Sequence, residues 1–265
     1  MDGVSFTAGF GECLALLGPN GAGKTTITEI LEGYRIPDGG AARVLDSIPW
    51  KSTLTWKSRI GIVLQTSRDL GDLTVRESVR HFAGYYPNPR DPDEVIAAVG
   101  LAEKAGKRNA TLSGGQRRRL DVALGIIGRP EVLFLDEPTT GFDPQARRDF
   151  WTLIEGLKSD GVTILLTTHY LDEAEHLADR VAVISGGRII ACETPARLGD
   201  RGTALAVVRW RDGDRIREEA TSHPTALVQQ LSTEFGGEVP ELIIQRPTLE
   251  DTYLELIRTA DGKST

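Results

Sequence analysis

The residues with the most definite chemistry form one glycine-rich stretch near the start of the chain. The stretch fits the pattern G-x-x-x-x-G-K-[ST], with an apolar run before it and a helix-forming run after it. Its glycines let the backbone approach an anion closely, and the N–H groups that open the following helix favour negative charge. The sequence therefore predicts a site for nucleotide phosphates. The predicted nucleotide-binding residues are Gly18, Pro19, Asn20, Gly21, Ala22, Gly23, Lys24, Thr25 and Thr26.

Two positions in this stretch have specific roles in the pattern. Lys24 would reach the β- and γ-phosphates, and the Thr25 hydroxyl would bind Mg²⁺. The alternative is a glycine turn that only precedes an ordinary amphipathic helix. The strand, loop and helix context favours the phosphate site.

Two carboxylates follow another apolar run, at residues 131–135. Asp136 and Glu137 would lie at the carboxyl end of a buried strand, where open α/β sheets bind their ligands. Asp136 is suited to hold Mg²⁺ through its water shell, and Glu137 is suited to polarise the water that attacks a γ-phosphate. The alternative is that these acids only cap a helix.

The elements that position these residues alternate between strands and helices. Such alternation predicts an α/β fold with a mainly parallel sheet that helices cover on both faces. A glycine turn at Ser185-Gly186-Gly187 predicts a hairpin, so one edge of the sheet should be mixed. Predicted strands cover 13–17, 59–64, 131–135, 162–166, 181–184 and 188–191, and predicted helices begin near 24, 74, 92, 113 and 143.

The pattern changes near residue 200. A strand at 204–210, a helix at 226–234 and a strand–helix pair at 242–257 indicate a small appended α+β module. The chain is therefore predicted to contain two parts, 1–199 and 200–265.

The overall composition narrows the class of protein. With 31 Lys and Arg against 38 Asp and Glu, the net charge of −7 argues against a nucleic-acid partner. No apolar run approaches the roughly 20 residues of a membrane span, and no signal peptide opens the chain. Cys13 and Cys192 are expected to be small hydrophobic residues in a reducing compartment. These features predict a cytosolic protein.

The order of the motifs resembles the nucleotide-binding subunit of an ATP-binding-cassette transporter over residues 2–195. The LSGGQ sequence is the most specific of them, because other common phosphate-loop classes do not carry it. The resemblance implies a P-loop NTPase cassette fold in which a helical subdomain, about 66–127, is inserted into the catalytic core. The motifs are GPNGAGKT at 18–25, Gln65, LSGGQ at 112–116, LFLDEP at 133–138, Gly141-Phe142-Asp143 and His169.

The resemblance also implies a set of catalytic residues for ATP hydrolysis. Gln65 is similar to the glutamine that joins Mg²⁺ and the attacking water to the helical subdomain. His169 resembles the switch histidine that contacts the γ-phosphate. The implied catalytic set is Glu137, His169, Gln65 and Lys24, the implied metal ligands are Thr25, Gln65 and Asp136, and the cofactors are ATP and Mg²⁺.

The resemblance further implies a dimer of identical chains. In the family, the signature sequence binds the ATP that the opposite protomer holds, so two chains enclose two nucleotides. Asp143 resembles the aspartate that links the two sites. Phe142 stands where the family has leucine, and we expect this change to have little effect. The signature residues are Leu112, Ser113, Gly114, Gly115 and Gln116.

The family's transporters also contain a permease, and here it must be a separate integral-membrane chain. It is expected to dock on the helical subdomain next to Gln65, which places this subunit at the cytoplasmic face of the cell membrane. Residues 169–175 and 246–254 resemble multidrug and daunorubicin-resistance export ATPases, which implies export of a drug-like or lipophilic compound. The transported compound itself is not predicted, since its contacts belong to the permease.

Two other functions are compatible with a nucleotide site. The first is a non-transport cassette ATPase of DNA repair or translation. Repair relatives insert a long coiled coil before the signature, whereas Lys24 and Ser113 are only 89 positions apart (113 − 24), and translation relatives carry two cassettes in each chain. The second is a nucleotide-binding module without catalysis, which Glu137 and His169 argue against.

Three further expectations concern charged and aromatic residues. The run Arg117-Arg118-Arg119 is expected to be a solvated helix face rather than a nucleic-acid site. Asp172, Glu173 and Glu175 are likewise expected to form a charged helix face beside His169. The family stacks adenine on an aromatic residue of a strand upstream of 2–6; that strand is expected to be missing here, with Phe6 part of the core.

Overall fold

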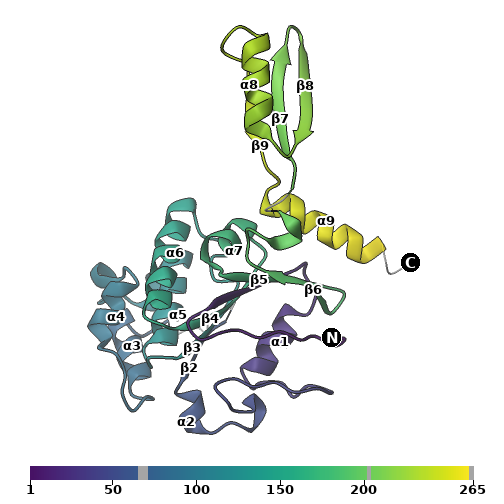
Figure 1. The fold of residues 1–265 in the computed structure, drawn as a ribbon. Helices are drawn as coiled ribbons and strands as arrows, with labels where there is room; N and C mark the ends of the chain where they lie inside the picture. Colours follow the sequence, from purple (N-terminus) through teal and green to yellow (C-terminus); the bar gives the residue numbers. More distant parts are fainter. Residues whose placement is uncertain (65–70, 202–203, 263–265) are drawn as a thin grey trace. The chain divides into compact units, whose positions relative to one another are not determined.

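The computed structural model describes residues 1–64, 71–201 and 204–262 (Figure 1). It divides into two compact units, Met1–Cys192 and Glu193–Thr265, each of which is described by itself below. The division lies at the end of the last strand of the first sheet, a few residues before the position predicted from the sequence.

The first unit is built on a six-stranded sheet with the strand order β2-β3-β4-β1-β5-β6. The pairs from β2 to β5 are all parallel, as the alternation of strands and helices predicted. β6 follows β5 through Gly186 and Gly187, both of which have positive φ, so the chain reverses there and the sheet is mixed at that edge. The strands are β1 Cys13–Leu17, β2 Ile60–Val63, β3 Val132–Asp136, β4 Thr163–Thr168, β5 Arg180–Ser185 and β6 Arg188–Glu193.

The parallel strands end together at one edge of the sheet. Leu17 of β1 lies opposite Thr168 of β4, and Thr167 lies opposite Asp136 of β3. Every residue of β1 and β4 is buried, which is why both runs are continuously apolar or carry only threonine. The loops that leave these strands therefore begin side by side.

The helices of the first unit connect and cover these strands. Helices α3, α4 and α5 pack against one another in the segment between β2 and β3 (Figure 1). The helices are α1 Lys24–Leu31, α2 Leu54–Lys57, α3 Val75–Ala83, α4 Pro92–Ala98, α5 Gly114–Ile126, α6 Pro144–Ser159 and α7 Leu171–Leu177, with 3₁₀ turns at Pro49–Lys51, Ala102–Lys104 and Asn109–Thr111.

Helix starts follow from capping residues that the sequence displays. The Thr74 side chain accepts a hydrogen bond from Glu77 N, and the Glu77 carboxylate accepts one from Thr74 N. These two bonds form a capping box where the sequence predicted a helix start. Asp91 caps α4 in the same local manner. Such caps satisfy N–H groups that the helix itself leaves unpaired.

The core of the first unit lies between the sheet and its helices. Leu16, Phe134 and Ile184 are buried in one cluster, and the half-buried Phe6 packs against it, as expected from the sequence. The backbones of β2 and α5 approach closely at Gly61 and Gly125, because a Cβ placed on Gly61 would overlap the Gly125 carbonyl oxygen. Glycine at this point lets the α5 helix lie directly on β2.

The second unit contains a three-stranded sheet in the order β8-β7-β9. Its core is Val208 and Trp210 of β7 against Leu227 and Leu231 of α8. The β8 strand was not predicted, because most of its side chains are charged and exposed, and its pairing with β7 defines it. The elements are β7 Ala206–Asp212, β8 Arg215–Thr221, α8 Pro224–Glu234, β9 Ile243–Gln245 and α9 Leu249–Gly262, with a 3₁₀ turn at Leu198–Asp200.

The contact between Gly61 and Gly125 predicts a large effect for a single methyl group. Gly61→Ala should lower the free energy of unfolding by about 1–3 kcal/mol, since α5 would have to move away from β2. Urea denaturation followed by circular dichroism measures the change. Gly106→Ala is the matched control, because a Cβ there meets open space. Equal midpoints for the two variants would contradict the close approach.

Candidate functional site

The glycine-rich loop forms a concave backbone turn between β1 and α1. A Cβ on Gly18 would lie 2.5 Å from the Ile184 carbonyl oxygen, so a larger residue would displace the loop from the sheet. Gly21 and Gly23 have φ values of +81° and +107°, which side-chain-bearing residues rarely adopt. The three glycines therefore give the loop a backbone conformation that would let it approach a small anion closely.

Lys24, the first residue of α1, lies within this loop. Its side chain is only 7% exposed, and Nζ donates to the carbonyl oxygens of Gly18 at 2.6 Å and Pro19 at 3.3 Å. Burial lowers the pKa of Lys24, while the negative charges of Glu137 and Asp136 oppose the shift. The Lys24 ammonium is thus held against the carbonyls of the loop. The negative charges of both predicted carboxylates act on it.

The two carboxylates lie at the end of β3. The Asp136 carboxylate accepts a hydrogen bond from the Thr167 hydroxyl at 2.5 Å. The N–H of Glu137 donates to the Thr167 carbonyl at 3.0 Å and to its hydroxyl at 3.1 Å. Thr167 therefore fixes both acids from the neighbouring strand. Glu137 adopts a φ of +44°, an uncommon backbone conformation for a residue with a side chain.

His169 enters the same site from the end of β4. Its Nδ1 lies 3.4 Å from a carboxylate oxygen of Glu137, whose side chain is 13% exposed. The ring also packs on that of Tyr170, with centroids 4.1 Å apart. The structure thus brings together the loop with Lys24, the pair Asp136 and Glu137, and His169. A bound phosphate and a water molecule beside it would contact all of these groups.

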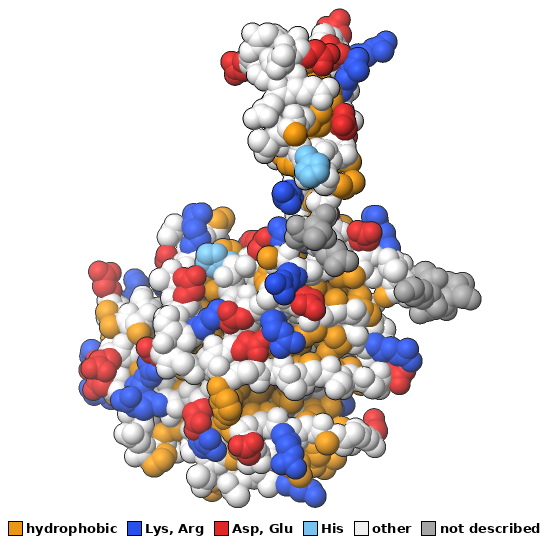
Figure 2. All heavy atoms as spheres, in the orientation of Figure 1, with side chains coloured by type: hydrophobic (Ala, Val, Ile, Leu, Met, Phe, Trp, Pro, Cys, Tyr) orange, Lys and Arg blue, Asp and Glu red, His pale blue; other side chains and the backbone are white. Residues whose placement is uncertain are grey.

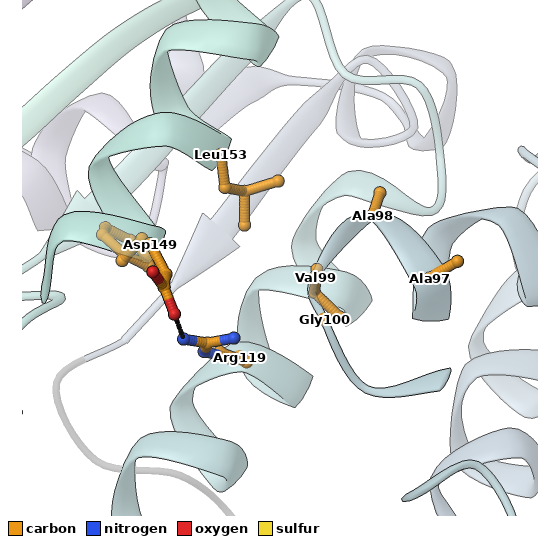
Figure 3. A pocket seen from close by; sticks show the side chains of 8 residues that line it. Ala97, Ala98, Val99, Gly100, Arg119, Asp149 and Leu153 are labelled. Carbon is orange, nitrogen blue, oxygen red and sulfur yellow. Dashed lines mark hydrogen bonds and ion pairs between the residues drawn. The ribbon is translucent and has the colours of Figure 1, made fainter. Parts of the chain in front are cut away.

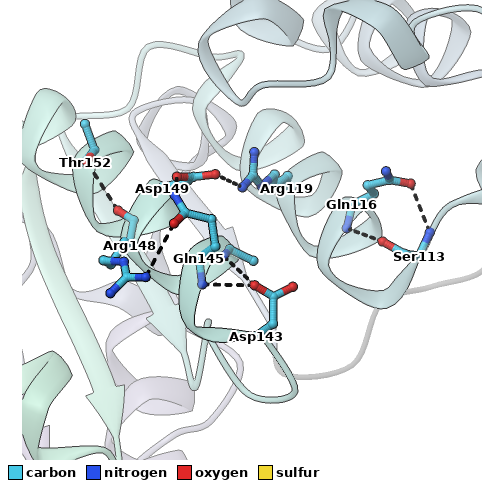
Figure 4. A network of polar contacts seen from close by, with 9 residues as sticks. Ser113, Gln116, Arg119, Asp143, Gln145, Arg148, Asp149 and Thr152 are labelled. Carbon is cyan, nitrogen blue, oxygen red and sulfur yellow. Dashed lines mark hydrogen bonds and ion pairs between the residues drawn. The ribbon is translucent and has the colours of Figure 1, made fainter.

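The signature residues begin α5. Ser113 is its N-cap: the hydroxyl accepts from Gln116 N at 3.3 Å, and the Gln116 side chain accepts from Ser113 N at 3.1 Å (Figure 4). Gly114 and Gly115 follow, and Gly114 is exposed with open space around its Cα. Leu112, in contrast, is buried. The signature therefore presents a helix N-terminus with glycines to the exterior of its own chain.

Asp143 caps the adjacent helix α6. Its carboxylate accepts from the N–H groups of Gln145 at 3.0 Å and Ala146 at 2.8 Å. Arg119 of α5 donates to Asp149 of α6 at 2.9 Å, and the Gln145 side chain donates to the same carboxylate (Figure 4). The two helices are thus joined one to two turns from their capped ends.

The donor set fits a nucleotide with Mg²⁺ better than a metal held by protein ligands alone. Within residues 1–64, 71–201 and 204–262, no three His, Cys, Asp or Glu side chains gather into a metal site. Thr25 is exposed at the start of α1 and supplies a single hydroxyl, and Asp136 supplies one carboxylate. Such a sparse set suits Mg²⁺, which keeps waters and phosphate oxygens as ligands. Gln65 lies outside the described residues.

A pocket of about 270 Å³ lies elsewhere, between α4, α5 and α6 (Figure 3). Val99 and Leu153 line it, and the Arg119–Asp149 ion pair lies against it. None of the predicted phosphate or carboxylate residues takes part in its lining. The predicted nucleotide site is therefore not this pocket, because its residues lie where the parallel strands end.

Two charged residues contradict the expectations from the sequence. Arg118 is only 7% exposed and Glu173 is fully buried, whereas both were expected on solvated helix faces. The helical repeat of the sequence indicated that these two residues are buried. Val122 and Ile126 follow Arg118 on the same buried face of the helix, and Leu177 follows Glu173 in the same way. A charged residue in an apolar stripe should have been assigned to the interior.

Glu173 is buried without compensation by a cation in contact. Among the described residues, neither carboxylate oxygen makes a regular hydrogen bond, although the Thr139 and Thr168 hydroxyls lie close to it. Burial raises the pKa of Glu173, while those hydroxyls and the charge of Arg147 oppose the shift. Burial therefore disfavours the charged form of Glu173 relative to an exposed carboxylate.

The surface agrees with the net charge. On the face drawn in Figure 2, basic side chains of the first unit are interspersed with acidic ones, which is unlike the basic stripe of a nucleic-acid site. Across the parts of the chain that the structure describes, every helix is too short or too polar to span a membrane.

Comparison with known proteins supports the order of motifs. Residues 1–140 match the family model described as ABC transporter. The Nod factor export ATP-binding protein I of Neorhizobium galegae is 43% identical over 281 residues, which cover 97% of this chain and 80% of that relative. These similarities extend well beyond the glycine-rich loop.

Two solved structures share the fold. One, described as the ATP binding subunit of an ABC transporter, has a TM-score of 0.70 at 23% identity and covers 96% of this chain and 91% of its own. The other is the dimeric post-hydrolysis state of the ATP-binding cassette MJ0796 bound to ADP and Pi. It has a TM-score of 0.65 at 24% identity and covers 72% of this chain and 88% of its own. The predicted fold class is confirmed.

The burial of Glu173 predicts a pH-dependent stability. Its folded pKa lies above the ordinary value of 4.5, so as pH rises the unfolded chain loses the proton first and the folded state loses stability. At pH 8 Glu173→Gln should be more stable than the original chain by roughly 1–3 kcal/mol, and the gain should vanish below about pH 4.5.

Urea midpoints at pH 4.5 and pH 8 measure this difference. The exposed Glu175→Gln is the matched control and should change stability by less than about 0.5 kcal/mol at either pH. A destabilising effect of Glu173→Gln at pH 8 would show that the carboxylate is charged and satisfied in the folded protein.

Proposed function

The chain belongs to the ABC transporter family, and from this premise we propose that it is the subunit that hydrolyses ATP to drive export through a separate membrane permease. It is an ATPase coupled to membrane transport, with ATP and Mg²⁺ as its cofactors. The proposal concerns the residues that perform the reaction, the dimer in which they act and the class of compound exported.

The observation that carries the proposal is the meeting of three sequence-distant groups at one sheet edge. These groups are the glycine loop with Lys24, the Asp136–Glu137 pair and His169. They follow the adjacent strands β1, β3 and β4, and Thr167 fixes the two acids. This arrangement supplies a phosphate cradle, a cation, a metal ligand and a base within one site. Phosphoryl transfer needs little else, because its catalysis is mainly positioning and charge stabilisation.

Glu137 is the proposed general base. Its carboxylate is largely shielded from solvent, and its backbone is held from β4, so the base is fixed before the reaction begins. His169, 3.4 Å away, can orient that carboxylate and present its other ring nitrogen to a phosphate oxygen. Lys24 would leave the carbonyls of Gly18 and Pro19 to contact the β- and γ-phosphates.

Mg²⁺ supplies neutralisation of the developing phosphate charge when it is bound. Thr25 and Asp136 would hold it, with Gln65 as the proposed third protein ligand. Asp136 is kept in place for this role by the Thr167 hydroxyl.

We propose that two copies of the chain enclose two ATP molecules. The signature end of α5 is exposed at Ser113 and Gly114, and a helix N-terminus of this kind suits an anion from another chain. Asp143, at the start of α6, would join the same interface. The dimeric state of MJ0796, which shares the fold, supports this arrangement. Each composite site would then need residues of both chains.

The proposed transported compound is drug-like or lipophilic, and the direction is export. Support comes from residues 169–175 and 246–254, which resemble multidrug-type export ATPases, and from the relative named for Nod factor export. The permease would place this subunit at the cytoplasmic face of the membrane. A role in DNA repair fits less well, because short helices rather than a long coiled coil separate Lys24 from the signature.

Replacement of the proposed base tests the ATPase mechanism. Glu137→Gln should hydrolyse ATP at least about a hundredfold more slowly, since a general base contributes ~10²–10⁴ in rate. It should still bind ATP and should shift from monomer to dimer in Mg·ATP. Steady-state hydrolysis, together with size-exclusion chromatography and light scattering, measures both properties.

The matched control for this experiment is Lys24→Ala. It removes the cation at the mouth of the loop, so ATP binding itself should weaken and no dimer should form. Near-normal hydrolysis by Glu137→Gln would exclude Glu137 as the base. Full ATP affinity in Lys24→Ala would contradict the assignment of the loop.

Transport is tested with the chain and its permease together in inside-out membrane vesicles. We expect ATP-dependent accumulation of a lipophilic fluorescent compound. The rate should be at least about tenfold lower with Glu137→Gln, because slow hydrolysis would limit the cycle of that variant. The permease without the chain is the control. Accumulation that is unaffected by Glu137→Gln would contradict the proposal, as would purification of the chain with ribosomes or DNA in place of a membrane protein.

A further inference from the structure

Arg118 differs from the two arginines beside it. Arg117 is exposed, and Arg119 reaches out from α5 to form the ion pair with Asp149. The Arg118 side chain instead lies in the interior, with 7% of the residue exposed. Burying a guanidinium is costly unless its N–H groups find partners, so its contacts show what the burial achieves.

The Arg118 guanidinium donates hydrogen bonds to carbonyl oxygens of two different segments. Nε donates to Pro138 O at 3.0 Å, and Nη2 donates to Asp136 O at 2.5 Å. Nη1 donates to Leu64 O. Asp136 and Pro138 are the residues on either side of Glu137. Leu64 directly follows β2.

Glu137 is thereby held from both sides of its backbone. The carbonyls before and after it accept from Arg118, and its own N–H donates to Thr167. This matters because Glu137 has a φ of +44°, a conformation that persists only when the surroundings impose it. Arg118 supplies one of the two sets of bonds that do so.

The charge of Arg118 is also placed to act on this site. Burial lowers the pKa of the guanidinium, and the carboxylates of Asp121, Asp136, Glu173 and Glu137 oppose that shift. The guanidinium donates to the backbone on either side of Glu137, and its positive charge acts on the carboxylates of Asp136 and Glu137.

We propose that Arg118 is a positioning residue that fixes Glu137 for catalysis and connects it to the signature end of α5. The inference rests on the proposed role of Glu137 as the base. Arg118 lies five residues after Ser113 on the same helix, so displacement of the signature moves the guanidinium that holds the base. One chain would thus link the ATP it hydrolyses with the ATP of its partner.

Only arginine suits this position. The guanidinium is a planar fork whose N–H groups point in fixed directions, and here three of its nitrogens reach three carbonyls. Lysine keeps the charge but has a single nitrogen that cannot span the peptides on both sides of Glu137. Arg118→Lys therefore removes the positioning and keeps a cation, while Arg118→Gln removes both.

The first test compares turnover with binding. Arg118→Lys should lower kcat by about 10–100-fold, since a misplacement of about 1 Å can cost that much. ATP affinity, measured by a fluorescent ATP analogue, should stay within threefold, because the loop at 18–25 is untouched. Arg148→Lys, an exposed arginine on α6, is the matched control and should change neither quantity.

The second test asks whether Arg118 acts through Glu137. In a Glu137→Gln background, Arg118→Lys should slow single-turnover hydrolysis by less than threefold, because the base that it positions is already absent. A residue that only stabilises the fold would slow both backgrounds equally. Thermal melting of Arg118→Lys and Arg118→Gln accompanies both tests.

Three results would overturn the inference. The first is a kcat for Arg118→Lys within threefold of that of the original chain, and the second is an equal loss of hydrolysis rate with and without Glu137→Gln. The third is a melting temperature of both Arg118 variants more than about 10 °C below that of the original chain. Failure of the proposed function gives a different pattern. There, Glu137→Gln itself would hydrolyse ATP at a near-normal rate, whatever the Arg118 variants do.

Discussion

The common end of the parallel strands is the constraint on which the site depends. Lys24 and His169 are 145 positions apart (169 − 24), yet β1 and β4 are paired so that their last residues lie opposite each other. Parallel strands hydrogen-bonded in register deliver every outgoing loop to one edge. The pairing of the strands therefore brings the phosphate loop, the acids and the histidine together. Contacts among these groups are not needed to stabilise the fold. Burial of the sheet provides that stability, which leaves the edge available for chemistry.

Both buried cations at this edge are held by backbone carbonyls. Lys24 donates to Gly18 and Pro19, and Arg118 donates to carbonyls beside Glu137. A carbonyl satisfies an N–H group without neutralising its positive charge. Both cations therefore keep their charge beside Asp136 and Glu137, where it can attract a nucleotide phosphate.

Local signals were sufficient to predict most of the elements, and long-range burial was not. Capping residues and apolar runs reveal helix starts and buried strands within a few positions, as at Thr74 and Ser113. The β8 strand lacked an apolar face, so only its partner β7 defines it. The glycine loop and its acids could be predicted as one site because their types and order are chemically specific, and the structure brings them together. The interior positions of Arg118 and Glu173 depend on segments far away in the sequence, and charge alone pointed to the surface.

The packing of α5 bears on how a dimer of such chains would be switched. Gly125 lies against the β2 backbone at Gly61, Arg119 is paired with Asp149 of α6, and Arg118 is bonded to the end of β3. Through these three attachments, a displacement of the signature at the start of α5 would be passed on to the end of β3. Binding of the partner's ATP at the signature would therefore adjust the base of the same chain. Each composite site of the proposed dimer would then be completed only at closure.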